Sequence, residues 1–386
     1  MCAAPLPHPA KQCSRCKTLY CSPACQAKHW KEGGHDKLCK KIKKNGGAEQ
    51  FHANEKYAAA VTVAAEACAE DTKGQTCYIC TEALHWKTKE GIVRGCACRG
   101  TAGFAHVSCL TEQVKILVAE AEENNLGYKA LNERVRRWYS CSLCEQDYHG
   151  VVCCALGWAG WKTYVGRPEA DELRGAALSE VANGLSIAQC HEDALAAREA
   201  YIFMLQRIGG SEENVLTAKS NLANTYEALG RGENATRIFR DVYSGYLKLQ
   251  GEEHGATLIA ASNYAASLED QDRNEEAKSL LRKTIPVAQR ILGESHEATL
   301  KMKSNHARAL YMATGATLDD LREAVNTLEE TERTARRVLG LSHPVTRMIA
   351  PTLRDARAAL SAREESDVNS LGETMEAMAP RNKHTN

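Results

Sequence analysis

The order and spacing of cysteine and histidine constrain this chain more than any other feature. Twelve of the seventeen cysteines fall into two blocks. The second block contains Cys77, Cys80, Cys96, Cys98, His106, Cys109, Cys141 and Cys144. Eight ligands of this kind can hold two zinc ions, each surrounded by four protein groups with no open position for water. The block therefore predicts two structural zinc sites and argues against metal catalysis.

The spacing within this block resembles the RING-CH finger. One residue separates Cys96 from Cys98, and His106 follows after seven more, whereas the plant-homeodomain finger has the same ligand order with a wider second pair. The residues from Cys98 to Phe104 also match the RING-CH signature. The resemblance implies a cross-braced pair of sites. One site would use Cys77, Cys80, His106 and Cys109, and the other Cys96, Cys98, Cys141 and Cys144.

The first block resembles a MYND finger over residues 13–39. It contains Cys13, Cys16, Cys21, Cys25, His35 and Cys39. The resemblance implies one complete zinc site, made by Cys13, Cys16, His35 and Cys39. The other site needs a further pair of cysteines to join Cys21 and Cys25, and upstream there are only Cys2 and His8. Either the finger is truncated or these two residues complete the site. We therefore expect three zinc ions per chain, or four if the second MYND site fills.

From about residue 170 the sequence repeats itself. The pairs Ser220-Asn221, Ser262-Asn263 and Ser304-Asn305 recur with a period of 42 residues, and a fixed period of this size is typical of a solenoid. The repeats resemble tetratricopeptide repeats of the kinesin light chain form, whose linkers carry glycine and then histidine. The corresponding histidines are His254, His296 and His343. We expect them to cap helices rather than bind metal.

The repeats predict a groove for an extended peptide. Helix pairs of this kind stack so that the first helix of each pair lines a concave surface. We expect Asn221, Asn263 and Asn305 to face that surface, where amide side chains can hold a peptide backbone by donating and accepting together. The alternative is that these amides bond within the solenoid. Asn224 and Arg308 are further candidates for the groove.

The predicted fold class is mostly α, with two small zinc-stabilised fingers followed by an α-solenoid of tetratricopeptide-type helix pairs. The predicted domains are a MYND-type finger (1–40), a helical linker (41–72), a RING-CH finger (73–150), a connector (151–173), the repeats (174–363) and a disordered tail (364–386).

Composition narrows the class of partner. Basic and acidic residues number 49 each, and the lysine-rich segment near residue 40 lacks interleaved aromatic side chains, so we do not expect nucleic-acid binding. The most apolar run, residues 151–161, is shorter than the ~20 residues that span a bilayer. Metal-type cysteine pairs indicate a reducing compartment. We therefore expect no membrane span and an intracellular location, in the cytoplasm rather than the nucleus.

The resemblances imply a RING-type E3 ubiquitin ligase. The finger would recruit a ubiquitin-conjugating enzyme (E2), the repeats would select the substrate, and the MYND finger would bind proline-rich peptides. Ile79 and Leu143, inside the first and last cysteine pairs, would form the apolar E2 contact together with Trp138. Two departures weaken this reading, because Glu145 stands where active fingers often carry a cation and Ser142 replaces the usual proline. The alternative is a non-enzymatic scaffold.

Overall fold

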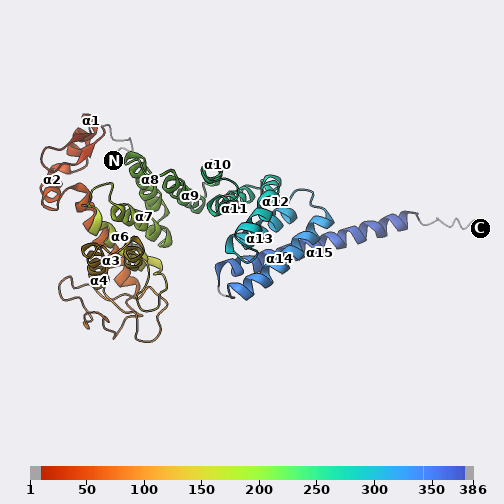
Figure 1. Ribbon diagram of the computed structural model, residues 1–386, viewed down its shortest axis with the longest axis horizontal. Helices are drawn as coiled ribbons and strands as arrows, with labels where there is room; N and C mark the ends of the chain where they lie inside the picture. The colour runs from red at the N-terminus through yellow and green to blue at the C-terminus, as the bar shows by residue number, and fades with distance from the viewer. Residues whose placement is uncertain (1–9, 342, 379–386) are drawn as a thin grey trace, which may run out of the picture. The chain divides into compact units, whose positions relative to one another are not determined.

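The computed structural model describes residues 10–341 and 343–378, and it divides into two compact units, Met1–Gly210 and Ser211–Asn386. Within the described residues it contains fifteen α-helices and one small two-stranded sheet (Figure 1). The predicted class is therefore confirmed: a mostly helical chain in which Cys/His-rich segments precede a solenoid of helix pairs.

The first unit begins with the sheet and ends in a helix pair. Its elements are β1 (Lys11–Gln12), β2 (Leu19–Tyr20), α1 (Pro23–Lys31), α2 (His35–Lys44), α3 (Ala48–Ala67), α4 (Val107–Glu123), α5 (Tyr128–Val135), the 3-10 turn η1 (Arg136–Trp138), α6 (Gly150–Tyr164), α7 (Glu172–Ile187) and α8 (His191–Arg207). Strands β1 and β2 pair antiparallel. Residues 69–106, between α3 and α4, are turns and loops apart from isolated β-bridges.

Helix α6 lies at the centre of the first unit. It is apolar around most of its circumference, which is typical of a helix covered on all sides. Helices α3, α4 and α7 pack against it, so residues expected only to connect two domains form the core instead. Two glycines allow the close approach of α6 and α7. A Cβ atom on Gly157 or Gly184 would lie 2.8 Å from the backbone of the opposite helix.

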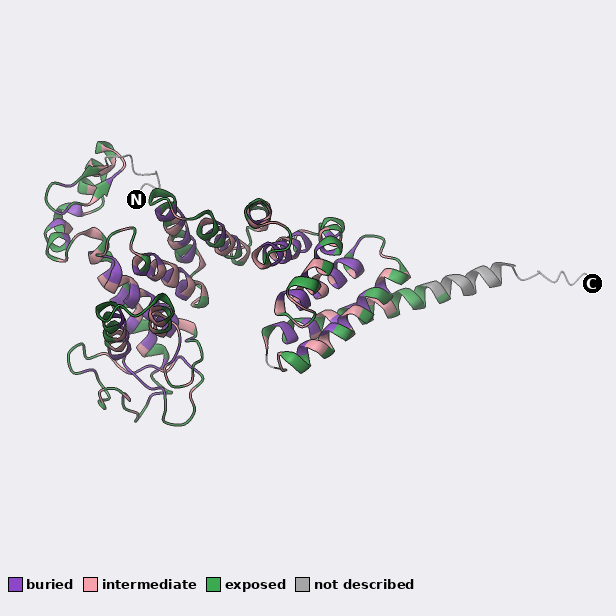
Figure 2. Cartoon of the chain, in the orientation of Figure 1, coloured by how far each residue is buried: buried purple, intermediate pink, exposed green. Residues whose placement is uncertain are grey.

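The second unit is a regular succession of antiparallel helix pairs. Its helices are α9 (Glu212–Ala228), α10 (Gly232–Gln250), α11 (Gly255–Glu269), α12 (Asn274–Ile291), α13 (Glu297–Met312), α14 (Leu318–Val338) and α15 (Pro344–Met378). Each helix packs against the next, and α11, α13 and α15 also contact one another in turn. Ala223, Ala265 and Ala307 occupy the same repeat position and are fully buried, which lets the helices approach closely. Figure 2 shows the buried residues along the inner faces of the pairs.

The repeated histidines cap helices, as predicted. The Nδ1 atom of His254 accepts a hydrogen bond from the backbone N–H of Ala256 at 3.2 Å, and His296 and His343 make the same bond two residues on at 3.1 and 3.3 Å. Each imidazole thus satisfies one of the backbone donors left open at a helix start.

The predicted disordered tail is helical over most of its length. Helix α15 continues through Met378, and residues 379–386 lie outside the described residues. Polar composition indicated disorder, but no proline and only one glycine interrupt residues 352–378. Arg322 also forms an ion pair with Glu364 at 3.1 Å, which ties the start of this segment to α14.

Candidate metal centres and partner surfaces

Three groups of four ligands come together in the first unit. In each group, one sulfur or ring nitrogen per residue lies within 4.8 Å of the others. The groups are Cys13, Cys16, His35 and Cys39; Cys77, Cys80, His106 and Cys109; and Cys96, Cys98, Cys141 and Cys144. The last two alternate along the chain, so the structure brings together the two crossed sets that the RING-CH resemblance implies.

The same backbone turn builds one side of each group. The turns begin at Cys13, Cys77 and Cys141. The N–H group of each of these cysteines donates to the carbonyl of the residue five positions later, and its carbonyl accepts from the N–H group of the residue four positions later, at 2.8 to 3.0 Å. The fourth residue after each cysteine has a positive φ between 57° and 64°. The N–H groups of Ile79 and Leu143 also donate to the sulfurs of Cys77 and Cys141 at 3.4 Å. Such turns hold two thiolates on one side of a metal ion.

A fourth turn of this form carries no cysteine. His85 donates its N–H to the carbonyl of Glu90, and Lys89 has the matching positive φ. Thr88 stands where the second cysteine would be, and its N–H donates to the His85 ring at 3.2 Å. The carboxylate of Glu90 then accepts from the N–H of Ser108 at 2.7 Å in the first turn of α4. This turn therefore anchors the helix that carries Cys109, and no cysteine pair marked it in the sequence.

The two ligand histidines use different nitrogens. His106 directs Nδ1 toward the sulfurs of Cys80 and Cys109, at 3.4 and 3.6 Å, and its Nε2 lies 3.4 Å from the carbonyl of Ala83. A backbone acceptor of this kind orients a metal-binding imidazole and sets its tautomer. His35 directs Nε2 toward the sulfur of Cys16 at 3.4 Å, and its own Nδ1 is buried with no hydrogen-bond partner in the described residues.

The raised pKa values of buried thiols in these groups are consistent with sites that a metal ion completes. Burial raises the pKa of Cys39 and of Cys96 to about 11 each, so these buried thiols resist ionisation without a counter-charge. Burial also opposes ionisation of Cys13, but several hydrogen bonds, of which the one from the Cys16 backbone contributes most, lower its pKa to about 6. A bound zinc ion deprotonates coordinating thiols outright and supplies the missing positive charge. The donor sets therefore fit zinc at all three groups.

The second MYND site is only half visible. Cys21 and Cys25 lie with their sulfurs 3.2 Å apart at the start of α1. Cys2 and His8, the residues that could complete this site, lie outside the described residues.

Ile79 lies in the turn that begins at Cys77, and Leu143 lies in the turn that begins at Cys141. Both side chains are accessible. Their side chains are 38% and 51% exposed. The neighbouring residues Tyr78 and Ser142 join the two turns through a hydrogen bond between their hydroxyl groups at 3.3 Å. The turns that carry the two exposed aliphatic side chains are therefore neighbours.

Trp138 is not one of these exposed side chains. It is only 4% exposed and packs edge-on against Tyr164, with ring centres 5.9 Å apart. Its ring also rests over Gly160 of α6. The expectation that Trp138 contacts an E2 enzyme is therefore wrong for this fold, because its apolar area is used in the core.

The sequence did not indicate a role for Arg137, yet its side chain contacts the turn that begins at Cys141. Its guanidinium donates to both carboxylate oxygens of Glu145, at 2.9 and 3.0 Å, and to the carbonyl of Cys141 at 3.3 Å. The hydrogen bonds from Arg137 hold the pKa of Glu145 below its usual range. A cation therefore does lie at this end of the finger, but a carboxylate neutralises it.

The predicted groove residues differ in their availability. Asn221, Asn263 and Asn305 are partly exposed, and their side-chain amides make no hydrogen bond among the described residues, so bonding within the solenoid is not what holds them. Asn224 is exposed. Arg308 is engaged, because its Nε lies 2.7 Å from the buried Glu269 and its guanidinium also pairs with Asp270.

Two family models match parts of the chain. Residues 1–39 match the MYND finger, and residues 214–289 match the tetratricopeptide repeat. No curated protein sequence matches the chain.

Two solved structures are similar to parts of this chain. A protein from Podosopora anserina with kinesin light chain TPR-like repeats is 21% identical, covers 57% of this chain and all of its own, and gives a TM-score of 0.41. BtubC (BKLC) from P. vanneervenii is 14% identical, covers 72% of this chain and 96% of its own, and gives a TM-score of 0.42.

The chain thus combines a MYND finger, further Cys/His clusters that can hold zinc, and tetratricopeptide repeats. This combination indicates a protein-interaction scaffold in which the repeats bind peptide segments of partner proteins. Among the described residues, no helix is long and apolar enough to cross a membrane.

Proposed function

We propose that the finger from Cys77 to Cys144 is a RING-CH-type E3 module that recruits an E2 enzyme, and that the repeats select the protein to be modified. No side chain of the finger would act as nucleophile. The E2 thioester would supply the chemistry, and the finger would contribute by holding it in a reactive orientation.

One observation carries this proposal. Two crossed ligand groups place the aliphatic side chains of Ile79 and Leu143 in solvent at the tips of adjacent turns, which the Tyr78–Ser142 hydrogen bond joins. Exposed aliphatic residues on turns that metal already stabilises are not needed for folding. They are suited to contacting a partner, since burying one such side chain contributes ~1.5 to 3 kcal/mol.

The test is ubiquitin transfer with the full, zinc-loaded chain and a panel of E2 enzymes. Ile79→Ala should weaken the E2 encounter by roughly ten- to a hundredfold and abolish autoubiquitination while zinc content stays the same. Ile116→Ala is the matched control, because Ile116 is an exposed aliphatic residue of α4 away from the two turns. Equal transfer by wild type and Ile79→Ala would refute the proposed E2 surface.

A non-enzymatic scaffold is the second candidate, and the Arg137–Glu145 pair favours it. Active fingers of this type use a cation beside the last zinc knuckle, and here Glu145 neutralises the nearest one. Glu145→Gln would free Arg137 without adding a charge. If the chain is an E3 module, this variant should transfer ubiquitin faster than wild type. If wild type and Glu145→Gln are both inert with every E2, the finger serves only to assemble partners.

The repeats would recognise an extended peptide through Asn221, Asn263 and Asn305. These amides recur once per repeat and are partly exposed. They can therefore donate to and accept from successive peptide groups. The MYND finger would add a second contact, to proline-rich segments. Asn263→Ala should weaken capture of a partner peptide and leave ubiquitin transfer to the finger itself unchanged.

A further inference from the structure

We propose that an open pocket between α3 and α6 binds the lysine side chains of a basic peptide segment from a partner protein. The pocket has a volume of about 570 Å³ and lies wholly within the first unit. It is distinct from the repeat groove and from the E2 surface, and it contains none of the metal ligands. This inference does not depend on the proposed ligase function.

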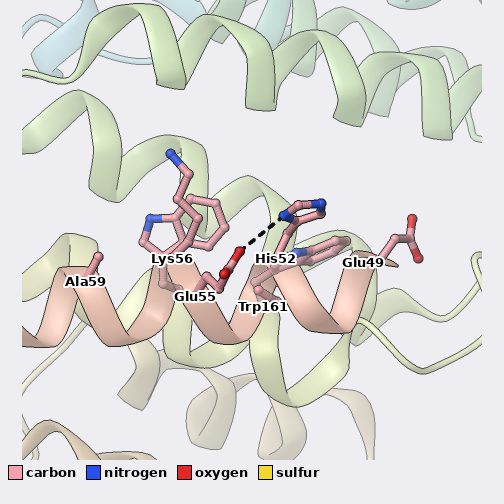
Figure 3. Close-up of a pocket in the computed structure, with 8 residues that line it drawn as sticks. Glu49, His52, Glu55, Lys56, Ala59 and Trp161 are labelled. Carbon is pink, nitrogen blue, oxygen red and sulfur yellow. Dashed lines mark ion pairs between the residues drawn. The ribbon is translucent and has the colours of Figure 1, made fainter. Parts of the chain in front are cut away.

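Two tryptophans supply the apolar wall of the pocket. Trp158 and Trp161 lie three residues apart on α6, so they share one face of that helix, and both are only partly buried against the core. Figure 3 shows the opposite wall, which α3 forms with the side chains of Glu49, His52, Glu55, Lys56 and Ala59. Ala59 is small and exposed, so the space in front of the indole rings is left open.

The indole rings already attract cations. Lys56 Nζ lies 6.0 Å from the centre of the Trp158 ring, and the Arg174 guanidinium lies 5.7 Å from the centre of the Trp161 ring. Both distances are near the outer limit of a cation–π contact, which is about 6 Å. Asp193 holds Lys56 at 3.1 Å and Glu49 holds Arg174 at 3.0 Å, so carboxylates restrain both cations. Because both cations lie near the outer limit of contact and are held by carboxylates, neither one sits closely on its indole ring.

The charge of the pocket favours an ammonium group. The pairs Lys56–Asp193 and Glu49–Arg174 cancel, which leaves Glu55 as the remaining fixed charge. Within the part of the chain that the structure describes, Glu55 pairs with His52 at 3.6 Å, and a histidine offsets a carboxylate only when it is protonated. A lysine side chain would place its apolar stem against the indoles and its ammonium group beside Glu55. An anionic or purely apolar segment would leave that carboxylate unpaired.

The test measures binding of a fluorescein-labelled peptide of alternating lysine and alanine to the full, zinc-loaded chain by fluorescence anisotropy. Ala59→Leu should fill the pocket without changing any charge and weaken binding at least about tenfold. Ala58→Leu is the matched control, because Ala58 is also exposed on α3 but does not line the pocket. It should bind within about twofold of wild type. Glu55→Gln should weaken binding about threefold to tenfold and reduce its salt dependence.

Three results would overturn the proposal: no saturable binding of the lysine peptide, equal affinities for Ala59→Leu and Ala58→Leu, or equal binding of a peptide in which glutamine replaces lysine. Circular dichroism and zinc content check that each variant is folded. If Ala59→Leu is misfolded, Glu55→Gln decides, and wild-type affinity in that variant would exclude an ammonium ligand.

Discussion

Replacing Glu269 by glutamine tests the effect of a buried carboxylate at the end of α11. The Glu269 side chain is fully buried, and Arg308 is its cationic partner. That guanidinium is shared with Asp270, whose negative charge opposes ionisation of Glu269. Burial is the larger effect and raises the pKa of Glu269 from 4.5 to about 8. The folded chain therefore keeps this proton over a pH range in which the unfolded chain has lost it.

The sign and size of the effect follow from this difference. Between pH 4.5 and about 8 the folded state binds one proton more than the unfolded state, so the free energy of unfolding falls as pH rises. At about 1.4 kcal/mol per pKa unit, the upper bound of the loss is about 5 kcal/mol. Glutamine has nearly the same shape and no proton to lose. Asp270 remains to pair with Arg308, so the variant leaves no unpaired buried charge.

The assay is urea unfolding of the full chain, followed by far-ultraviolet circular dichroism at pH 5 and pH 9. Glu269→Gln should match wild type at pH 5 and exceed its free energy of unfolding by about 2 to 4 kcal/mol at pH 9. Glu276→Gln removes an exposed, ion-paired carboxylate and should change stability by less than about 1 kcal/mol at either pH. A Glu269→Gln variant that is weaker than wild type at pH 9 would show that the ion pair outweighs burial.

Three further outcomes are expected. Native mass spectrometry should find at least three zinc ions per chain, and two or fewer would remove one of the ligand groups. Chelation should abolish hydrogen-exchange protection around residues 77–144 and leave protection in α9–α14, because the solenoid has its own core; loss of protection throughout would contradict this division. His254→Ala should lower the free energy of unfolding by about 1 kcal/mol through loss of a helix cap, whereas Lys248→Ala, an exposed change nearby, should have little effect. Equal stabilities for the two variants would mean that the His254 cap contributes nothing.

Features that depend on local spacing were predictable from the sequence. A cysteine pair needs only a short turn to bring two sulfurs together, so Cys77 and Cys141 marked their knuckles directly. A 42-residue period marks the same helix pair each time it recurs, and the capping role predicted for His254 from its place in the repeat is confirmed.

Features that depend on which segments cover one another were not predictable in this way. The apolar run of α6 showed that something must bury it, but not that α3, α4 and α7 do so. For the same reason the burial of Trp138 against Tyr164 was missed. The pair between Arg137 and Glu145 exists only because the last knuckle reverses the chain between them. Composition alone also failed for α15, where helix propensity persists in a polar segment.

The alternation of the two ligand groups also affects how the finger forms during synthesis. The group with Cys77 is complete once Cys109 has left the ribosome, but Cys96 and Cys98 wait for Cys141 and Cys144. At about 5 to 20 residues per second, the intervening stretch of about 35 residues takes roughly 2 to 7 s to emerge. During that interval a nascent chain carries one closed metal site and one open pair of thiols. Cys77, Cys80, Cys96 and Cys98 all emerge before His106, so translation order alone does not select the correct partners for the first ion, and the thiols of the second site stay available for mispairing until Cys144 appears.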